Sequence, residues 1–334
     1  MKAFYIDHYG DENAVKFGDQ PQPALATTEV LVKIHAASIN PLDLRVLHGD
    51  FKLLLPFKLP LILGSDMAGS VVAVGSAVSG FKVGDEVYAK ADDSWAGTFA
   101  EYIVIKPAAL ALKPKSLSMQ EAAALPLVAL TAWQALVQIA QLQRGQKLLV
   151  HAGSGGVGSI AIQLAKHLGA TVATTTSSSN AEWVKALGAD VVIDYKSADF
   201  ADVIHDYDVV LDTQGGRALE KSLQVLKHGG RVISISGPPD ADFARNIQAN
   251  WLLRFIIPLL SYSIRKKAKK AGLSYTFLFM QPNGQQLASI AELVDAGYIR
   301  PVLDKVYPFA QTREALSYVK TGRSKGKVVV HIAV

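Results

Sequence analysis

The stretch from Lys147 to Ala170, KLLVHAGSGGVGSIAIQLAKHLGA, constrains the fold of this chain more than any other. Its apolar run at 148–150 has the length of a short strand, and apolar residues from 160 to 168 recur at helical spacing. Between them, Gly153-Ser154-Gly155-Gly156-Val157-Gly158 spells G-x-G-x-x-G. A strand, a tight glycine turn and a helix N-terminus present free backbone N–H groups to a diphosphate. The stretch therefore predicts a dinucleotide site rather than a plain turn.

Strand-like and helix-like segments continue to alternate after Gly158. We expect strands at 171–175, 191–193, 208–211, 231–235 and 275–280, and helices at 160–168, 181–187 and 218–226. This alternation predicts an α/β fold with a doubly wound parallel sheet of the Rossmann type, which binds its ligand at the carboxyl ends of the strands. At two of those strand ends, Thr213 and Ser236 are candidate cofactor ligands.

The end of the second strand of this sheet bears on the choice of cofactor. NAD-dependent enzymes carry Asp or Glu there, about 20 residues after the glycines, to bind the ribose 2′-hydroxyl. Here residues 174–180 read TTTSSSN, with no acid until Glu182. A carboxylate would repel a 2′-phosphate, whereas the hydroxyls of Ser177 and Ser178 can solvate one. We therefore predict NADP(H); the open alternative is a polar loop whose serines cap a helix.

Short strands and glycine turns dominate the first third of the chain and predict a compact β-barrel-like domain. We expect an edge strand at 2–6, and a strand at 29–37 with one buried and one wet face. The proline-interrupted apolar run at 51–63 is expected to be a loop that walls an apolar pocket. Asn40 and Asp43, three residues apart, could point at one spot or simply cap a short helix.

The composition excludes several kinds of chemistry. The 334 residues include no cysteine, which rules out disulfides, thiolate zinc ligands and a thiol nucleophile. The eight histidines are scattered without metal-ligand spacing, so no metal site is predicted. A net charge of +5 suits anionic small ligands and is too diffuse to indicate nucleic acid. The N-terminus lacks the long apolar core of a signal peptide, so a cytoplasmic location is expected.

Several ordered motifs resemble the medium-chain dehydrogenase/reductase superfamily: GSDMAGSVVAVG, KVGDEVYA, GTFAEYIVI and HAGSGGVG. More narrowly, the chain resembles the zinc-free quinone oxidoreductase and alkenal/enone reductase branch. The resemblance implies a GroES-like β-barrel catalytic domain at 1–124 and 298–334, and a Rossmann domain at 125–297. Zinc-dependent relatives have G-H-E-x-x-G where this chain has GSDMAG at 64–69, and a catalytic cysteine near residue 38, so the resemblance implies a zinc-free enzyme.

The resemblance also implies roles for single residues. Thr131 matches a threonine beside the nicotinamide, although it could instead bond back to its own helix. Tyr195 is expected at the 2′-phosphate; no arginine lies in that loop, and Lys185, Lys196 and Arg323 remain unranked substitutes. The backbone around Phe277 and Phe279 is expected at the nicotinamide carboxamide, on a strand that often pairs with a second subunit, so a homodimer is predicted. Residues 321–327 are similar to the family's C-terminal glycine–lysine turn.

The implied reaction is hydride transfer from NADPH to a quinone or an α,β-unsaturated carbonyl compound. Asn40 and Thr131 are the candidates for stabilising the developing oxyanion by hydrogen bonds, and Asp43 is expected to orient Asn40. The apolar run at 51–63 indicates a small apolar substrate. Two alternatives stay open: an alkenal/enone reductase with little quinone activity, and a non-catalytic NADPH-binding regulator.

Two apolar stretches could be mistaken for membrane spans. Residues 122–142 are interrupted by Pro126, Thr131 and three glutamines, and the latter part is expected to form a core helix. Residues 251–264 contain Arg254 and Pro258 and precede the basic run RKKAKK at 265–270. This second stretch is expected to be a helix with a solvated end, a substrate lid or a peripheral membrane patch, and no integral membrane segment is predicted.

Overall fold

The computed structural model describes residues 1–52, 54, 57–91 and 97–332. It divides into two compact units, one formed by Met1–Leu130 with Gln281–Val334 and the other by Thr131–Met280. The boundary falls inside helix α3 (Pro126–Trp133), which continues as a π-helical segment, Gln134–Ile139. Part of the loop expected at 51–63 lies outside the described residues.

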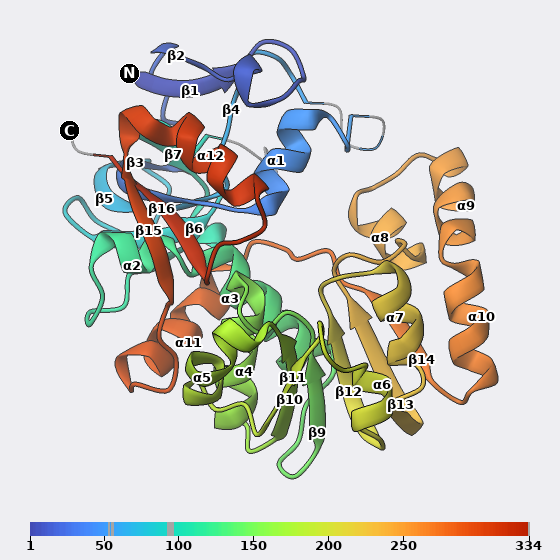
Figure 1. Cartoon of the computed structure of the whole chain (residues 1–334). Helices are drawn as coiled ribbons and strands as arrows, with labels where there is room; N and C mark the ends of the chain where they lie inside the picture. Colours follow the sequence, from blue (N-terminus) through green and yellow to red (C-terminus); the bar gives the residue numbers. More distant parts are fainter. Residues whose placement is uncertain (53, 55–56, 92–96, 333–334) are drawn as a thin grey trace. The chain divides into compact units, whose positions relative to one another are not determined.

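The second unit is built on a six-stranded parallel sheet of order β11-β10-β9-β12-β13-β14 (Figure 1). β9 comes first in the chain and lies inside the sheet, so the strand order reverses between β9 and β12. This reversal is the topological switch point of a doubly wound sheet and confirms the predicted fold class. The strands are β9 (Lys147–Val150), β10 (Thr171–Thr176), β11 (Val191–Asp194), β12 (Tyr207–Asp212), β13 (Leu226–Ser234) and β14 (Ser274–Phe277).

Burial on both faces explains why strand β9 contains a continuous apolar run. Leu148, Leu149 and Val150 of β9 have no exposed surface, as expected for a parallel strand covered on both faces. Leu149 belongs to a core that also includes Leu219 and Ile264 from two of the covering helices. The helices of this unit are α4 (Gly156–His167), α5 (Ala181–Ala186), α6 (Phe200–Val203), α7 (Gly216–Ser222), α8 (Ala241–Asn246), α9 (Trp251–Leu260) and α10 (Tyr262–Lys270).

The first unit contains a seven-stranded sheet of order β15-β16-β3-β5-β6-β8, with β7 pairing on β3, and a three-stranded sheet of order β2-β1-β4. All pairings are antiparallel except that of β15 with β16. The strands are β1 (Lys2–Ile6), β2 (Lys16–Asp19), β3 (Val30–Ile39), β4 (Leu61–Ile62), β5 (Asp66–Val74), β6 (Glu86–Lys90), β7 (Tyr102–Ile105), β8 (Leu110–Leu112), β15 (Leu303–Pro308) and β16 (Lys327–His331).

Two sequence-based expectations for this unit are wrong in detail. β1 is the middle strand of its sheet rather than an edge strand, because β2 and β4 pair on its two sides. β3 lacks a wet face, since eight of its ten residues are buried. Its neighbours β5, β7 and β16 occupy its edges, and α2 packs against it. Both errors come from pairings that are distant in the sequence.

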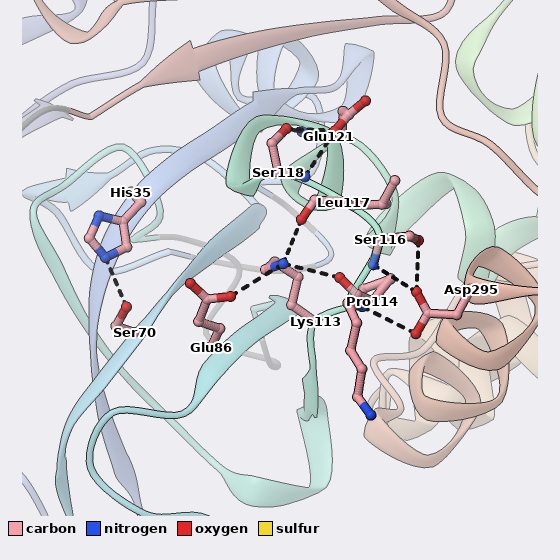
Figure 2. A network of polar contacts seen from close by, with 11 residues as sticks. His35, Ser70, Glu86, Lys113, Pro114, Ser116, Leu117, Ser118, Glu121 and Asp295 are labelled. Atoms are coloured by element: carbon pink, nitrogen blue, oxygen red, sulfur yellow. Dashed lines mark hydrogen bonds and ion pairs between the residues drawn. The ribbon is translucent and has the colours of Figure 1, made fainter.

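The helices of the first unit are α1 (Pro41–His48), α2 (Met119–Ala123), α11 (Gly284–Asp295) and α12 (Thr312–Lys320). Figure 2 shows the polar contacts that fasten the loop after β8 to α11. The Asp295 carboxylate accepts hydrogen bonds from the backbone N–H groups of Lys115 (3.1 Å) and Ser116 (2.9 Å), and the Lys113 ammonium donates to the carbonyl of Leu117 (2.5 Å). No helix in the described part of the chain is long and apolar enough to span a membrane.

Candidate functional site

The glycine turn after β9 has a geometry that only glycine satisfies at two positions. A Cβ atom at Gly158 would lie 2.3 Å from the carbonyl oxygen of Ala152, and one at Gly153 would lie 2.2 Å from Thr174 Oγ1. The turn is tied to β10 by hydrogen bonds from Gly153 N to Thr175 O (3.0 Å) and from Ala152 N to Thr175 Oγ1 (3.1 Å). The close approach of helix α4 to strand β9 therefore depends on these glycines.

The N-terminus of α4 fits an anionic group. Its capping residue is Gly155, which has no side chain to bond the first N–H groups, and its first turn carries no acidic residue. Ser154, Gly156 and Val157 are partly exposed, so their backbone N–H groups are within reach of a ligand. Unsatisfied N–H groups and the positive end of the helix dipole together favour a diphosphate.

The end of β10 brings the predicted 2′-phosphate residues together. Thr176 is buried, and its Oγ1 has no hydrogen-bond partner among the described residues. Ser177 and Ser178 follow it directly, and the backbone N–H of Tyr195 donates to Thr176 O (3.2 Å) while the Tyr195 side chain is 62% exposed. A buried hydroxyl without a partner, next to the half-buried Ser177 and the exposed Ser178, fits a ligand that supplies hydrogen-bonding oxygens.

A carboxylate that the sequence argument overlooked lies at the same tip. Asp194 ends β11, and its pKa is held below the usual value by a hydrogen bond from Lys196 N (3.0 Å) and by hydrogen bonds from Ser178. The Ser178 hydroxyl therefore already has Asp194 as a hydrogen-bond partner. Parallel pairing of Thr176 with Asp194 was the signal that could have revealed this neighbour, because both residues end adjacent strands.

Asp212, at the end of β12, holds the next two strand tips in place. Its buried carboxylate accepts hydrogen bonds from Ser234 Oγ (2.6 Å) and Gly215 N (3.0 Å). The two predicted ligands sit on this framework: Thr213 Oγ1 donates to His151 O (3.0 Å), and Ser236 Oγ donates to Thr213 O (2.9 Å). The structure thus brings Thr213 and Ser236 together with the end of β9.

His151 has a structural role in this framework. Its ring is buried between Thr175 Oγ1 (3.3 Å) and Ser222 Oγ (2.9 Å), and burial lowers its pKa. A neutral imidazole enclosed in this way links β10 to α7 and is not placed to deliver a proton to a ligand.

Phe277 and Phe279 follow one another around the end of β14. Both rings contact the Phe243 ring edge-on, with centroids 5.4 and 5.0 Å away. The Phe277 N–H donates to Asp240 Oδ2 (2.9 Å), so this donor is already used. If the backbone around Phe277 and Phe279 contacts the nicotinamide carboxamide, it must use other groups, such as a carbonyl oxygen.

In the first unit, Asn40 and Asp43 meet in a buried polar cluster. Asn40 caps α1, and its backbone N–H donates to Asp43 Oδ2 (2.7 Å). The other oxygen, Asp43 Oδ1, accepts from Ser65 Oγ (2.6 Å). Of the two alternatives drawn from the sequence, the shared spot is present through the Asn40 backbone, whereas the Asn40 side chain contacts Asp66 and Lys327 and makes no capping hydrogen bond.

The cluster extends through Asp66, which starts β5 and has no exposed surface. Its Oδ2 accepts from Ser38 Oγ (3.0 Å) and Asn40 Nδ2 (2.9 Å), and its Oδ1 accepts from Leu127 N (2.9 Å). The buried ammonium of Lys327, at the start of β16, lies 3.5 Å from Asp66 Oδ2. Lys327 belongs to the C-terminal glycine–lysine turn at 321–327, and its sequence neighbours give no sign of this role.

Lys327 and Asp66 fix the orientation of the Asn40 amide. Lys327 Nζ lies 2.5 Å from Asn40 Oδ1, and a lysine ammonium can only donate. Asp66, when ionised, can only accept, so it faces Asn40 Nδ2. We name this arrangement of Asn40, Asp66 and Lys327 the Asn40 clamp. One amide hydrogen of Asn40 serves Asp66, and the second finds no acceptor in the part of the chain that the structure describes.

Burial governs the acid–base behaviour of the cluster. It raises the pKa of Asp43 to about 6, against the opposing effects of hydrogen bonds from Ser65 and Asn40. Burial likewise raises the pKa of Asp66 and lowers that of Lys327, while their mutual attraction opposes both shifts. Thr131, the remaining candidate, is a buried residue of α3 that falls within the second unit.

The residues at the positions of the relatives' zinc site do not fit a metal ion. Ser38 and Asp66 bond each other, Ser65 bonds Asp43, and the positive charge beside Asp66 is the Lys327 ammonium. Zinc prefers Cys, His and carboxylate ligands in a tetrahedral set. No group of three or more His, Cys, Asp or Glu side chains that could hold a metal occurs in the described ranges.

A doubly wound sheet with a glycine-rich turn at its switch point is the architecture of a dinucleotide-binding protein, and in this chain it is joined to a unit of mainly antiparallel strands. Family models agree: residues 26–115 match the alcohol dehydrogenase GroES-like domain and residues 187–330 match a zinc-binding dehydrogenase.

Individual proteins resemble the chain over nearly its whole length. It is 38% identical to the 2-methylene-furan-3-one reductase of Solanum lycopersicum, covering 99% of this chain and 79% of that protein. It is 36% identical, with the same coverage, to the chloroplastic NADPH-dependent alkenal/one oxidoreductase of Arabidopsis thaliana. The quinone oxidoreductase structure from Coxiella burnetii superposes with a TM-score of 0.86 at 32% identity, covering 100% of this chain and 99% of that one. The chain belongs to the medium-chain dehydrogenase/reductase superfamily and is an NAD(P)H-dependent oxidoreductase.

Proposed function

We propose that this chain is an NADPH-dependent, zinc-independent reductase of quinones or α,β-unsaturated carbonyl compounds. The observation that carries the proposal is the Asn40 clamp, whose Asp66 stands in the GSDMAG stretch that replaces the G-H-E-x-x-G motif of zinc-dependent relatives. A buried amide held by an ammonium and a carboxylate can donate its spare N–H to a carbonyl oxygen without help from a metal. The names of the relatives support the two substrate classes.

The end of β10 supports NADPH as the cofactor. Its residues Thr176, Ser177 and Ser178 offer hydroxyls and no carboxylate. Asp194 opposes this preference, but its charge is stabilised by Lys196 N, and the positive Lys196 side chain belongs to the same turn. The hydroxyls, the exposed Tyr195 ring and Lys196 together suit a 2′-phosphate better than a bare ribose.

Each part of the chain then has a separate task in the reaction. Bound NADPH supplies the hydride from C4 of its nicotinamide. Gly153–Gly158 and the N-terminus of α4 hold its diphosphate, and Thr213 and Ser236 line the neighbouring strand ends. Asn40 donates to the oxygen of the acceptor, where negative charge develops. Asp43 is a positioning residue that accepts from the Asn40 backbone N–H.

A panel of acceptors tests this proposal. The oxidation of NADPH and of NADH is followed with 1,4-quinones, 2-alkenals and enones at micromolar protein. We expect consumption of NADPH, and kcat/KM at least about tenfold higher with NADPH than with NADH. Equal rates with both cofactors would refute the cofactor assignment. Binding of NADPH without turnover of any acceptor would instead support the non-catalytic regulator.

A pair of variants locates the cofactor preference. Ser177→Asp adds a carboxylate at the end of β10, and repulsion of the 2′-phosphate is expected to reduce the NADPH-to-NADH ratio of kcat/KM by roughly tenfold or more. Gln224→Glu adds the same charge after α7, before β13, and should leave the ratio unchanged. An unchanged ratio in Ser177→Asp would contradict the placement of the 2′-phosphate. The cytoplasmic location and the homodimer stay predictions.

A further inference from the structure

Helices α9 and α10 expose a face that the proposed reaction does not use. Trp251 is 81% exposed, Phe255 70% and Leu259 58%, and these three residues repeat at intervals of four along α9. A spacing of four places them on one side of a helix. Leu252, Ile256 and Leu260 widen the same side, while Ile257 on the opposite side is buried. Monomeric proteins rarely leave such contiguous apolar surface uncovered.

Helix α10 continues this surface with positive charge. Figure 1 shows α9 and α10 stacked end to end at the margin of the second unit. Tyr262, Lys266 and Lys270 repeat at intervals of four along α10, and all three are exposed. Ile264 and Ala268 of the same helix are buried and contribute to the core of the unit. The rigid attachment of α10 thus presents its basic side outward.

The charge on this surface is concentrated and largely uncompensated. Residues 251–270 contain six basic and no acidic side chains, which leaves 28 basic against 29 acidic side chains in the rest of the chain. Lys267 pairs with Glu220 at 2.9 Å, and Lys266 lies over the Tyr262 ring. Lys269 and Lys270 have no acidic partner among the described residues. The positive charge of the whole chain is therefore a local property of this segment.

We propose that the α9–α10 face, defined by the exposed residues of 251–270, docks on the surface of an anionic phospholipid bilayer. Exposed Trp, Phe and Leu side chains suit the boundary between headgroups and acyl chains, and adjacent lysines suit phosphate and carboxylate headgroups. A second copy of the chain fits less well, because a two-fold interface would place six positive charges against six. An acidic protein partner would complement α10 but would not explain the six exposed apolar side chains of α9.

Vesicle binding by the whole protein tests the proposal. Co-sedimentation is measured with vesicles of phosphatidylcholine alone and of phosphatidylcholine with about 30% phosphatidylserine. We expect binding to the anionic vesicles at low salt, much weaker binding to the neutral ones, and release at high salt because the lysines are screened. Absence of binding to anionic vesicles at low salt by the folded protein would overturn the proposal.

Variants assign the binding to this face. Lys269→Gln/Lys270→Gln is expected to lower the vesicle partition coefficient roughly 30-fold, while Lys115→Gln/Lys325→Gln removes two exposed lysines of the first unit and should change it little. Trp251→Ser/Phe255→Ser should also abolish binding. Thermal unfolding establishes that each variant is folded. Equal loss of binding in both lysine pairs would overturn the proposal, since it would show attraction by net charge alone.

A last measurement separates the bilayer from a second copy of the chain. Molecular mass in solution is determined by light scattering for the wild type and for Trp251→Ser/Phe255→Ser. We expect the same mass for both proteins, together with a blue shift of Trp251 fluorescence when anionic vesicles are added to the wild type. A variant that dissociates while vesicle binding persists would show that the face joins two copies, and the proposal would be wrong.

Discussion

The Lys327 ammonium is buried next to two buried carboxylates, and this arrangement is sensitive to the loss of any one charge. Lys327 contacts Asn40 and lies 3.5 Å from Asp66, both of which come from the other end of the chain. Removing one member of a buried pair leaves the other charge without compensation, which costs more than removing both. The clamp should therefore behave as a unit in folding as well as in catalysis.

A double-mutant cycle measures this coupling. Lys327→Met is expected to lower the free energy of unfolding by about 3–5 kcal/mol, because Asp66 loses its counter-charge. Lys327→Met/Asp66→Asn should recover at least about 1 kcal/mol of that loss. Urea denaturation of the wild type, both single variants and the double variant gives the coupling free energy. Additive losses would mean that the two charges do not stabilise each other.

Asp43 should make stability depend on pH in an unusual direction. Its pKa is about 6 in the folded protein and 3.8 for the ordinary side chain, so the folded chain keeps the proton where the unfolded chain has lost it. The free energy of unfolding therefore falls as pH rises from about 4 to about 6. Asp43→Asn removes this contribution, and its stability relative to the wild type should rise by on the order of 3 kcal/mol over that range. Urea denaturation at several pH values measures the difference.

Asp85→Asn serves as a control for the direction in which stability changes with pH. Hydrogen bonds from Lys82 hold the pKa of Asp85 below its usual value, so ionised Asp85 stabilises the fold. The stability of this variant relative to the wild type should fall, not rise, as pH increases through about 4. If stability relative to the wild type changed in the same direction with pH in both variants, the raised pKa of buried Asp43 would be contradicted.

The candidate residues differed in how far the sequence could reveal them. Asn40 and Asp43 are three apart, so local spacing predicted their contact. The partnership of Lys327 with Asn40 joins positions 287 apart in sequence and lies in a stretch, TGRSKGK, that looks like an exposed basic turn. The available signal was the apolar strand that Lys327 begins, which buries its first residue. The pairing of β16 with β3 brings Lys327 to Asn40, and the residues next to Lys327 in the sequence do not reveal this.

At the level of elements, the three glycines of the G-x-G-x-x-G turn have separable duties. Gly158 stands where a Cβ would collide with the Ala152 carbonyl at 2.3 Å, whereas a Cβ at Gly155 would meet the same oxygen at 3.3 Å. Gly158 therefore secures the packing of α4. Gly155 caps α4 and keeps its N–H groups open to the ligand.

Two alanine substitutions distinguish these duties. Gly158→Ala is expected to destabilise the second unit by about 2 kcal/mol or more and to weaken NADPH binding, because the turn must open. Gly155→Ala should change stability by less than about 1 kcal/mol and still weaken NADPH binding at least about tenfold. Fluorescence titration with NADPH and thermal unfolding report the two effects. Equal stability of the two variants would contradict the packing role of Gly158.

Elements were predictable where their environment follows from local pattern. All six strands of the parallel sheet overlap the expected ranges. β9 is an apolar run, as expected for a strand buried on both faces, whereas β10 (TVATTT) buries threonines and was expected from the alternation of strands and helices. Helix α6 (Phe200–Val203) was missed because four residues are too few to show a helical period. Helix α8 (Ala241–Asn246) was also missed, although α5 has the same length and overlaps an expected helix. In the first unit, the neighbours of β1 and β3 depend on distant pairings and could not be inferred.

At the level of the whole molecule, the two units have separate hydrophobic cores. One includes Phe4, Ile34 and Val330, and the other includes Leu149, Val210 and Val232. All the predicted diphosphate ligands belong to the second unit. Binding of NADPH at this site should therefore stabilise the second unit more than the first.

Calorimetry with and without NADPH tests this separation. At a free NADPH concentration of about 100 times Kd, the transition of the second unit should gain about 2.7 kcal/mol, which corresponds to a rise in Tm of roughly 5–10 °C. The transition of the first unit should move much less. A single transition that shifts as a whole would show that the units unfold together.

The first unit is discontinuous in the chain, and this has a consequence for its biosynthesis. β16, with Lys327 at its start, fills the place between β15 and β3. The ribosome makes residues 281–334 only after the whole of 131–280, so the second unit can fold while the first still lacks two strands. During that interval the edge of β3 is open and Asn40 has no lysine partner. The order of folding on the ribosome is thus the reverse of the order in which the two units begin in the sequence.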